Sequence, residues 1–239
     1  MGPRTTTTST PDLNVVFLPG LGADGRLFAA QREVFPNLIS PPWLAPAGHE
    51  DLAQYAARLA EKVPLGRPLF LGGCSLGGML AYEMARLLRP DALVLMGSAS
   101  SRHEIPAYLR LLAGLARIVP LAGFRLARLA PPAVGHLFGV HDIEQRWILI
   151  DMFRRTSPEF FRWACAAIHE WNPQPLAAVP VFVIHGAHDR ILPLGRRAVD
   201  VVIKGAGHLL TMTHHQQVNE FLYKIKEGLT DTTKAVAAS

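Results

Sequence analysis

The segment LGGCSLGGML, residues 71–80, places a single serine inside a cluster of glycines between two apolar stretches. It fits the pattern G-x-S-x-G over residues 73–77, with Ser75 at its centre. A sharp strand-to-helix turn forces its central residue into strained backbone geometry and tolerates only small neighbours. Such a turn lifts the hydroxyl beside free helix N–H groups, which favour developing negative charge. The pattern predicts Ser75 as a nucleophile, while a glycine-rich turn with an incidental serine is the plain structural alternative.

A serine hydroxyl needs a base to remove its proton, and the base needs a carboxylate to orient it. Among ten histidines, His208 differs by its setting in IKGAGHLL, directly after the last predicted strand. Asp189, in IHGAHDRILP, follows the preceding predicted strand. A loop histidine and a turn aspartate are the plain alternatives. Because all three residues follow predicted parallel strands, at the edge where such sheets bind ligands, we predict that Ser75, His208 and Asp189 form a catalytic triad.

Apolar strand patterns alternate with amphipathic helices on both sides of these residues, which is typical of a parallel sheet covered on both faces. We therefore predict an α/β fold with a mostly parallel central sheet. The strands are expected at residues 13–18, 67–73, 91–100, 179–186 and 198–205, and helices at 23–35, 51–63, 76–90 and about 214–227.

From residue 101 to 172 the strand pattern stops, and proline-punctuated helices are expected at about 104–117, 120–130, 142–154 and 158–170. This predicts an α/β core, 12–100 and 173–228, interrupted by a helical cap at 101–172. The first 11 residues and residues 229–239 are expected to be disordered.

Taken together, the motifs LPGLGADGRLF, GGCSLGG, HGAHDRILP and GAGHLL resemble the α/β-hydrolase family of the serine esterase type, over nearly the whole chain. The resemblance implies the roles of nucleophile for Ser75, general base and then acid for His208, and orienting partner for Asp189. It also implies an oxyanion hole made by the backbone N–H groups of Leu21 and Leu76.

Two features depart from the family pattern. Pro19-Gly20 stands where many members carry His-Gly, in the loop that leads to Leu21. The interval from Asp189 to His208 (208 − 189 = 19) leaves room for about one helical turn, which predicts a shortened connection.

The predicted cap is rich in leucine and alanine, so the resemblance implies a hydrophobic acyl or alkyl part in the substrate. Candidate substrate-binding residues are Ser98, Phe138 and Trp147, and further aromatic candidates are Phe153, Phe160, Phe161 and Trp163. No acidic residue lies between Ile105 and Val140, while four arginines do. A membrane-facing surface is one interpretation; a cap with solvated arginines is the one that we favour.

Composition excludes several other classes. The net charge of +5 is scattered, without a nucleic-acid motif, so no nucleic-acid partner is expected. No run approaches the roughly 18 apolar residues of a membrane span, so no stable membrane insertion is expected. Two cysteines and no export signal predict a cytoplasmic protein. No Cys/His cluster has metal-ligand spacing, so neither a metal nor a cofactor is predicted, and the oligomeric state stays open.

These patterns predict a serine hydrolase that acts on a small or medium carboxylic ester through an acyl-enzyme. The same triad would serve a thioesterase, an acyltransferase, a lactonase or a carbon–carbon bond hydrolase. From another class, a ligand-binding receptor with vestigial activity could retain the same fold.

Overall fold

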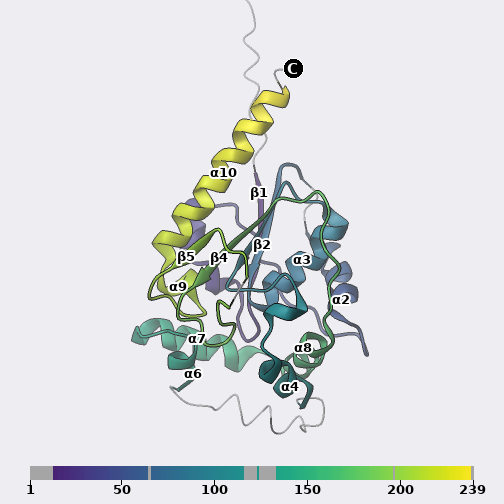
Figure 1. The fold of residues 1–239 in the computed structure, drawn as a ribbon, viewed down its shortest axis with the longest axis vertical. Coiled ribbons are helices and arrows are strands. Elements are labelled where there is room, and N and C mark those ends of the chain that lie inside the picture. Colours follow the sequence, from purple (N-terminus) through teal and green to yellow (C-terminus); the bar gives the residue numbers. More distant parts are fainter. Residues whose placement is uncertain (1–12, 64–65, 116–122, 124–132, 196, 238–239) are drawn as a thin grey trace, which may run out of the picture.

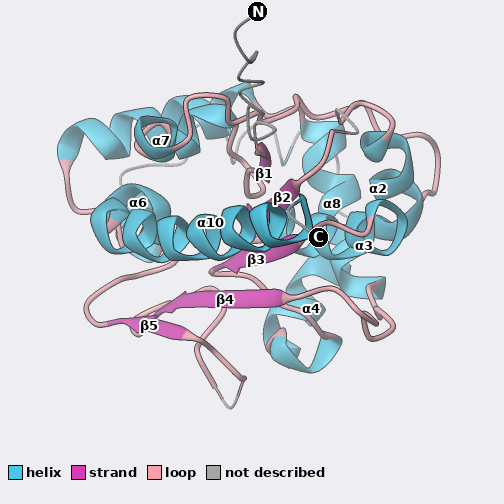
Figure 2. Cartoon of the chain, turned by 90° about the horizontal axis from the view of Figure 1, so that it is seen from above, coloured by secondary structure: helices cyan, strands magenta, loops and turns pink. Residues whose placement is uncertain are grey.

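The computed structural model describes residues 13–63, 66–115, 123, 133–195 and 197–237. Its centre is a parallel five-stranded sheet in the order β1-β2-β3-β4-β5 (Figure 1). The strands are β1 (Asn14–Leu18), β2 (Leu69–Cys74), β3 (Ala92–Met96), β4 (Val181–Gly186) and β5 (Val201–Ile203). In the view turned by 90°, β3, β4 and β5 lie side by side, with β5 at the edge (Figure 2).

Helices cover both faces of this sheet. On one side lie α2 (Leu52–Ala60) and α3 (Leu76–Leu88), and on the other η1 (Gly25–Phe28), α1 (Gln31–Val34), α9 (Leu210–Thr213) and α10 (His215–Ala237) (Figure 1). Successive side chains of a strand point to opposite faces of the sheet. In β1, Val16 and Leu18 belong to the hydrophobic cluster that contains α2 and α3, whereas Val15 and Phe17 belong to the one that contains α10. Because both faces of the central strands are buried, these strands are apolar at most positions, and the predicted α/β fold class is confirmed.

A helical insertion interrupts the sheet between β3 and β4. It contains η2 (Arg102–Glu104), α4 (Ala107–Leu115), α6 (Ala133–Leu137), α7 (Ile143–Arg155) and α8 (Pro158–Glu170), which lie together at one end of the sheet (Figure 1). Side-chain caps start two of them: Asp142 accepts from Gln145 N, and Ser157 accepts from Phe160 N. The helix expected at 120–130 falls almost entirely outside the described residues, as do the first 11.

Several predicted boundaries differ from the structure: the strands expected over 91–100 and 198–205 are shorter, at Ala92–Met96 and Val201–Ile203. Two other differences change the elements themselves. The helix expected over 23–35 is divided into η1 and α1, because the Asp24 side chain caps a separate short turn by accepting from Arg26 N. The tail expected to be disordered from residue 229 instead continues α10 to Ala237. Once a helix is formed, each added residue gains a hydrogen bond, which favours its continuation along this segment. No helix among the described residues is long and apolar enough to cross a bilayer.

Candidate active site

Ser75 occupies a tight turn between β2 and α3. Its φ of 53° and ψ of −122° lie where a non-glycine residue is strained. A Cβ on Gly73 would collide with the backbone of Gly77, and one on Gly77 would collide with the Leu18 carbonyl. These contacts explain why the pattern needs glycine on both sides of the serine.

Ser98 lies under this turn. It is fully buried, and its hydroxyl donates to the Ser75 carbonyl oxygen at 2.6 Å. A Cβ on Gly78 would collide with the Ser98 hydroxyl, so the first turn of α3 packs closely against the segment after β3. The structure therefore places Ser98 as a support of the turn backbone, outside the lining of the neighbouring cavity, in contrast to the substrate-binding role expected for it.

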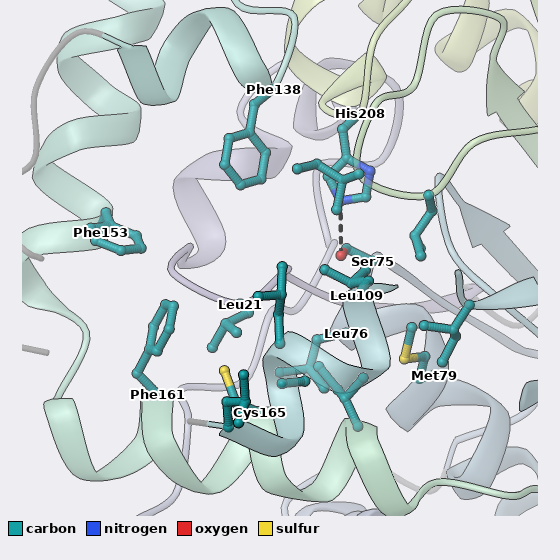
Figure 3. A pocket seen from close by; sticks show the side chains of 17 residues that line it. Leu21, Ser75, Leu76, Met79, Leu109, Phe138, Phe153, Phe161, Cys165 and His208 are labelled. Atoms are coloured by element: carbon teal, nitrogen blue, oxygen red, sulfur yellow. Dashed lines mark hydrogen bonds between the residues drawn. The ribbon is translucent and has the colours of Figure 1, made fainter. Parts of the chain in front are cut away.

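The three side chains predicted to act together form one hydrogen-bonded chain. His208 Nε2 lies 2.9 Å from Ser75 Oγ (Figure 3). His208 Nδ1 lies 2.7 Å from Asp189 Oδ2. His208 is 1% exposed and Asp189 is 5% exposed, so water barely reaches the hydrogen bond between these two residues. The arrangement can move the Ser75 proton to Nε2 while the carboxylate stabilises the resulting imidazolium.

The charge on Asp189 is well stabilised. Burial acts to raise the pKa of this carboxyl, but the charge of His208 and hydrogen bonds from His185, His208 and the Leu192 N–H outweigh it and hold the pKa well below its usual range. Both Ile191 N and Leu192 N donate to Oδ1 at 2.8 Å. The carboxylate therefore stays ionised, with Oδ1 occupied by backbone and Oδ2 directed to the imidazole.

The connection that carries Asp189 is short and has no helix among its described residues between β4 and β5. Arg197 stabilises it instead. Its nearly buried guanidinium donates to the carbonyl oxygens of Ser98, Glu104 and Pro193 at 2.6, 2.8 and 3.1 Å. A buried guanidinium requires several acceptors, and here they join the Asp189 loop to the start of the helical insertion.

Leu21 and Leu76 flank the serine hydroxyl. The loop after β1 approaches so closely that a Cβ on Gly20 would lie 3.3 Å from Ser75 Cβ. Leu76 is the first residue of α3, where a backbone N–H has no partner within the helix. Both leucine side chains line the same cavity as Ser75. The backbone N–H groups of Leu21 and Leu76 stay the predicted oxyanion donors, the kind of group that stabilises such a charge.

A cavity of about 500 Å³ opens over Ser75 and His208 (Figure 3). Its described lining is almost entirely apolar: Leu21, Leu76, Met79, Ile105, Leu109, Leu112, Ala113, Leu115, Phe138, Phe153, Phe161, Cys165, Ile168, Ile191 and Leu192. Phe138 also lies against the catalytic-site imidazole, with 5.6 Å between the ring centroids of Phe138 and His208. The only hydrogen-bonding side chains of the described lining, other than the Cys165 thiol, are Ser75 and His208.

The aromatic residues expected to line a pocket divide into three groups. Phe138, Phe153 and Phe161 line the cavity. Phe160 and Trp163 are buried in the core beside Tyr55. Trp147, which was expected to bind substrate, does not line the cavity. Its side chain is 60% exposed, because it lies on the outer face of α7. An aromatic side chain on an amphipathic helix can point either way, and its type alone does not decide which.

Most of the aliphatic lining was not predicted from the sequence, and neither were Met79, Leu109 and Cys165. Met79 follows Ser75 by one helical turn on α3, so its spacing could have indicated it. Cys165 lies one turn after Phe161 on α8, which could have served in the same way. The pKa of the Cys165 thiol is raised to about 12 by burial, so this thiol is neutral.

The loop after β1 contacts α7 of the insertion at three points. Arg26 bridges Asp24 and Asp151 at 2.7 Å each. The Asp24 N–H lies 3.5 Å from the Met152 sulfur. A Cβ on Gly22 would lie 2.6 Å from the Phe153 ring. The insertion is therefore packed directly on the loop that carries Leu21.

Among the described residues, no group of three His, Cys, Asp or Glu side chains has the geometry to hold a metal ion.

Comparisons with known proteins place this geometry in a family. The fold is similar to that of a thermophilic esterase from Thermogutta terrifontis, with a TM-score of 0.72, 20% identity, and coverage of 93% of this chain and 92% of that one. It is also similar to ClbQ from the colibactin NRPS/PKS pathway, with a TM-score of 0.62, 17% identity, and coverage of 92% and 99%.

In sequence, 122 residues are 35% identical to the non-reducing polyketide synthase ntnG from Nectria sp; the match spans 43% of this chain but only 6% of that much longer protein. A profile of the Alpha/beta hydrolase family matches residues 15–221, which is most of the chain. The chain therefore belongs to the alpha/beta hydrolase family.

Proposed function

We propose that the protein is a serine hydrolase that cleaves an uncharged carboxylic ester through an acyl-enzyme on Ser75. The observation that carries the proposal is the continuous hydrogen-bonded chain from Ser75 Oγ through His208 to Asp189, exposed at one end to an apolar cavity. A hydroxyl, an imidazole and a carboxylate in this order form the arrangement that activates a serine.

In the first half of the reaction, Ser75 Oγ attacks the ester carbonyl carbon while His208 Nε2 takes the hydroxyl proton. The carbonyl π electrons move to oxygen, and the N–H groups of Leu21 and Leu76 stabilise the negative charge. The intermediate then expels the alkoxide, which receives the proton from the imidazolium. Water repeats the sequence on the acyl-enzyme, with His208 as its base, and releases the acid and free Ser75.

The cavity lining supports an apolar substrate. A carboxylate or ammonium group entering this cavity would lose its hydration without gaining a charged partner among the described lining residues, which costs several kcal/mol. An alkyl chain loses nothing by entering, and each buried methylene gains about 0.8 kcal/mol. A medium-length aliphatic acyl group therefore fits better than a charged one.

A thioester is the second candidate, because its acyl part and its reaction with Ser75 are the same as those of an ester. Two of the similar proteins are named for polyketide synthesis: ntnG is a polyketide synthase, and ClbQ comes from an NRPS/PKS pathway. These names support thioester hydrolysis as the second candidate. Acyltransfer, lactone hydrolysis and carbon–carbon bond cleavage would use the same residues and differ in the acceptor or the leaving group.

A panel of paired substrates tests the proposal. We would measure kcat/KM for p-nitrophenyl acetate, butyrate and octanoate, and for the acyl-CoA thioesters of the same chain lengths. Ester hydrolysis predicts faster turnover of the p-nitrophenyl series, and a thioesterase predicts the reverse. Ser75→Ala should lower kcat by roughly 10⁶ and abolish labelling by a serine-directed phosphonate. Full turnover by this variant would refute the proposal, and a single-equivalent burst with no steady phase on any substrate would favour the receptor.

A further inference from the structure

His185 lies at the end of β4 and is completely buried, and the steps above do not use it. Its Nε2 is 2.7 Å from the Leu192 carbonyl oxygen and 3.2 Å from Asp189 Oδ2. A carbonyl oxygen and an ionised carboxylate only accept hydrogen bonds, so Nε2 must carry the proton. Nδ1 is buried and has no hydrogen-bond partner in the described structure. The imidazole therefore presents its N–H to the loop that carries Asp189.

Leu192 connects this N–H to the carboxylate. Its carbonyl oxygen accepts from His185, while its own N–H donates to Asp189 Oδ1 at 2.8 Å. The peptide units on both sides of Leu192 are thus fixed by two hydrogen bonds, one to β4 and one to the carboxylate. With Oδ1 held in this way, Oδ2 faces His208 Nδ1 at 2.7 Å, and His185 Nε2 lies 3.2 Å from the same oxygen.

The choice of histidine here has a cost that an apolar residue would avoid. A buried polar nitrogen without a partner destabilises a folded protein. A leucine would fill similar space in a strand that is otherwise apolar at its buried positions, and it would leave no orphan. It would, however, leave the Leu192 carbonyl without a donor and the loop free to shift.

We propose that His185 is a positioning residue for the hydrolase reaction, which holds the Asp189 carboxylate toward His208 through the Leu192 peptide. This inference rests on the proposed function, because it assigns His185 to the same reaction. It goes beyond the triad by adding a second buried histidine, whose Nε2 lies 3.2 Å from the same Oδ2 that His208 contacts.

Two variants of similar size separate positioning from packing. In His185→Gln, the side-chain amide N–H reaches the place of Nε2 and can still donate to Leu192. In His185→Asn, the amide is one bond shorter and falls near the place of Nδ1, so the Leu192 carbonyl loses its donor. His188→Gln is the matched control, because His188 is exposed and lies on the same loop.

The readouts are kcat and KM on p-nitrophenyl butyrate, and the far-downfield proton resonance of a His208 Nδ1–H bonded to a carboxylate. We expect His185→Asn to lower kcat about tenfold, the order expected for loss of one buried hydrogen bond, with KM unchanged and the resonance weakened. His185→Gln should recover most of kcat and the resonance, and the control should match the wild type.

Two results would overturn the proposal: wild-type kcat and resonance in His185→Asn, or equal impairment of the Gln and Asn variants at equal thermal stability. The resonance is observed without turnover, and Ser75→Ala is measured in parallel. If Ser75→Ala retained full activity while His185→Asn weakened the resonance, the proposed function would fail and the positioning of Asp189 by His185 would stand.

Discussion

Replacing Asp189 by asparagine changes one atom, and the structure determines which way the new amide must turn. Oδ1 accepts two backbone N–H groups, from Ile191 and Leu192, so the amide oxygen has to stay at this position. The amide nitrogen then occupies the place of Oδ2 and presents N–H to His208 Nδ1. Two donors cannot face each other, so His208 must place its proton on Nε2, which then cannot accept the Ser75 proton.

The expected loss is large and confined to turnover. A wrong imidazole tautomer lowers kcat by about 10⁴, the size known for this change in a serine protease triad. KM should change little, because Asp189 does not line the cavity. The assay is steady-state hydrolysis of p-nitrophenyl butyrate, with a circular dichroism melt to show that the variant is folded.

Asp200→Asn is the control. Asp200 Oδ2 accepts from Val183 N at 2.7 Å, a bond that an amide oxygen can also make, and Asp200 does not contact His208. It should keep nearly full activity. More than a tenth of wild-type kcat in a folded Asp189→Asn protein, or a greater loss in Asp200→Asn, would refute the reasoning.

The same substitution alters acid stability. The pKa of Asp189 is lower in the folded protein than the roughly 3.9 of an unfolded chain. Its ionised form therefore stabilises the fold at neutral pH, and this contribution is lost as pH falls from about 4 toward the lowered folded value. Between pH 5 and 2, the free energy of unfolding should therefore depend less steeply on pH in Asp189→Asn, which has no proton to bind at this site. Denaturant unfolding at a series of pH values measures this slope.

Four further changes test other parts of the structure. Gly77→Ala should prevent a well-formed turn at Ser75, because its Cβ meets the Leu18 carbonyl, and should show as low soluble yield or a strongly lowered Tm. Alkylation of Cys165 should be slow at pH 7 and accelerate about tenfold per pH unit, since burial raises the pKa of its thiol to about 12; a pH-independent rate would contradict this. Leu109→Trp should fill part of the cavity and lower kcat/KM for octanoate more than for acetate, so equal losses would place the acyl chain elsewhere. Arg197→Met should lower Tm by several degrees, since it leaves buried carbonyl oxygens without a donor; an unchanged melt would show that water replaces the guanidinium.

The sequence by itself determined the fold class and selected the three residues that the structure brings into one hydrogen-bonded chain. Strands buried on both faces must be apolar throughout, so the runs around Val15–Leu18 and Leu69–Leu71 were recognisable without coordinates. The G-x-S-x-G spacing also follows from local sterics, because the collisions that exclude a Cβ at Gly73 and Gly77 involve the turn itself and the adjacent strand end. Ser75, Asp189 and His208 could be selected because parallel strands end at a common edge.

Tertiary structure alone decided what surrounds these residues. An aromatic residue in a helix has a side-chain type but no direction until the helix packs, so Phe138 and Trp147 were equal candidates, and only one lines the cavity. Ser98 was expected to bind substrate and supports the Ser75 backbone instead. The role of His185 depends on a carbonyl oxygen seven residues away, at a distance that no sequence pattern specifies. Packing and hydrogen-bond direction depend on where whole elements meet in space, and this is why they could not be predicted from residue types.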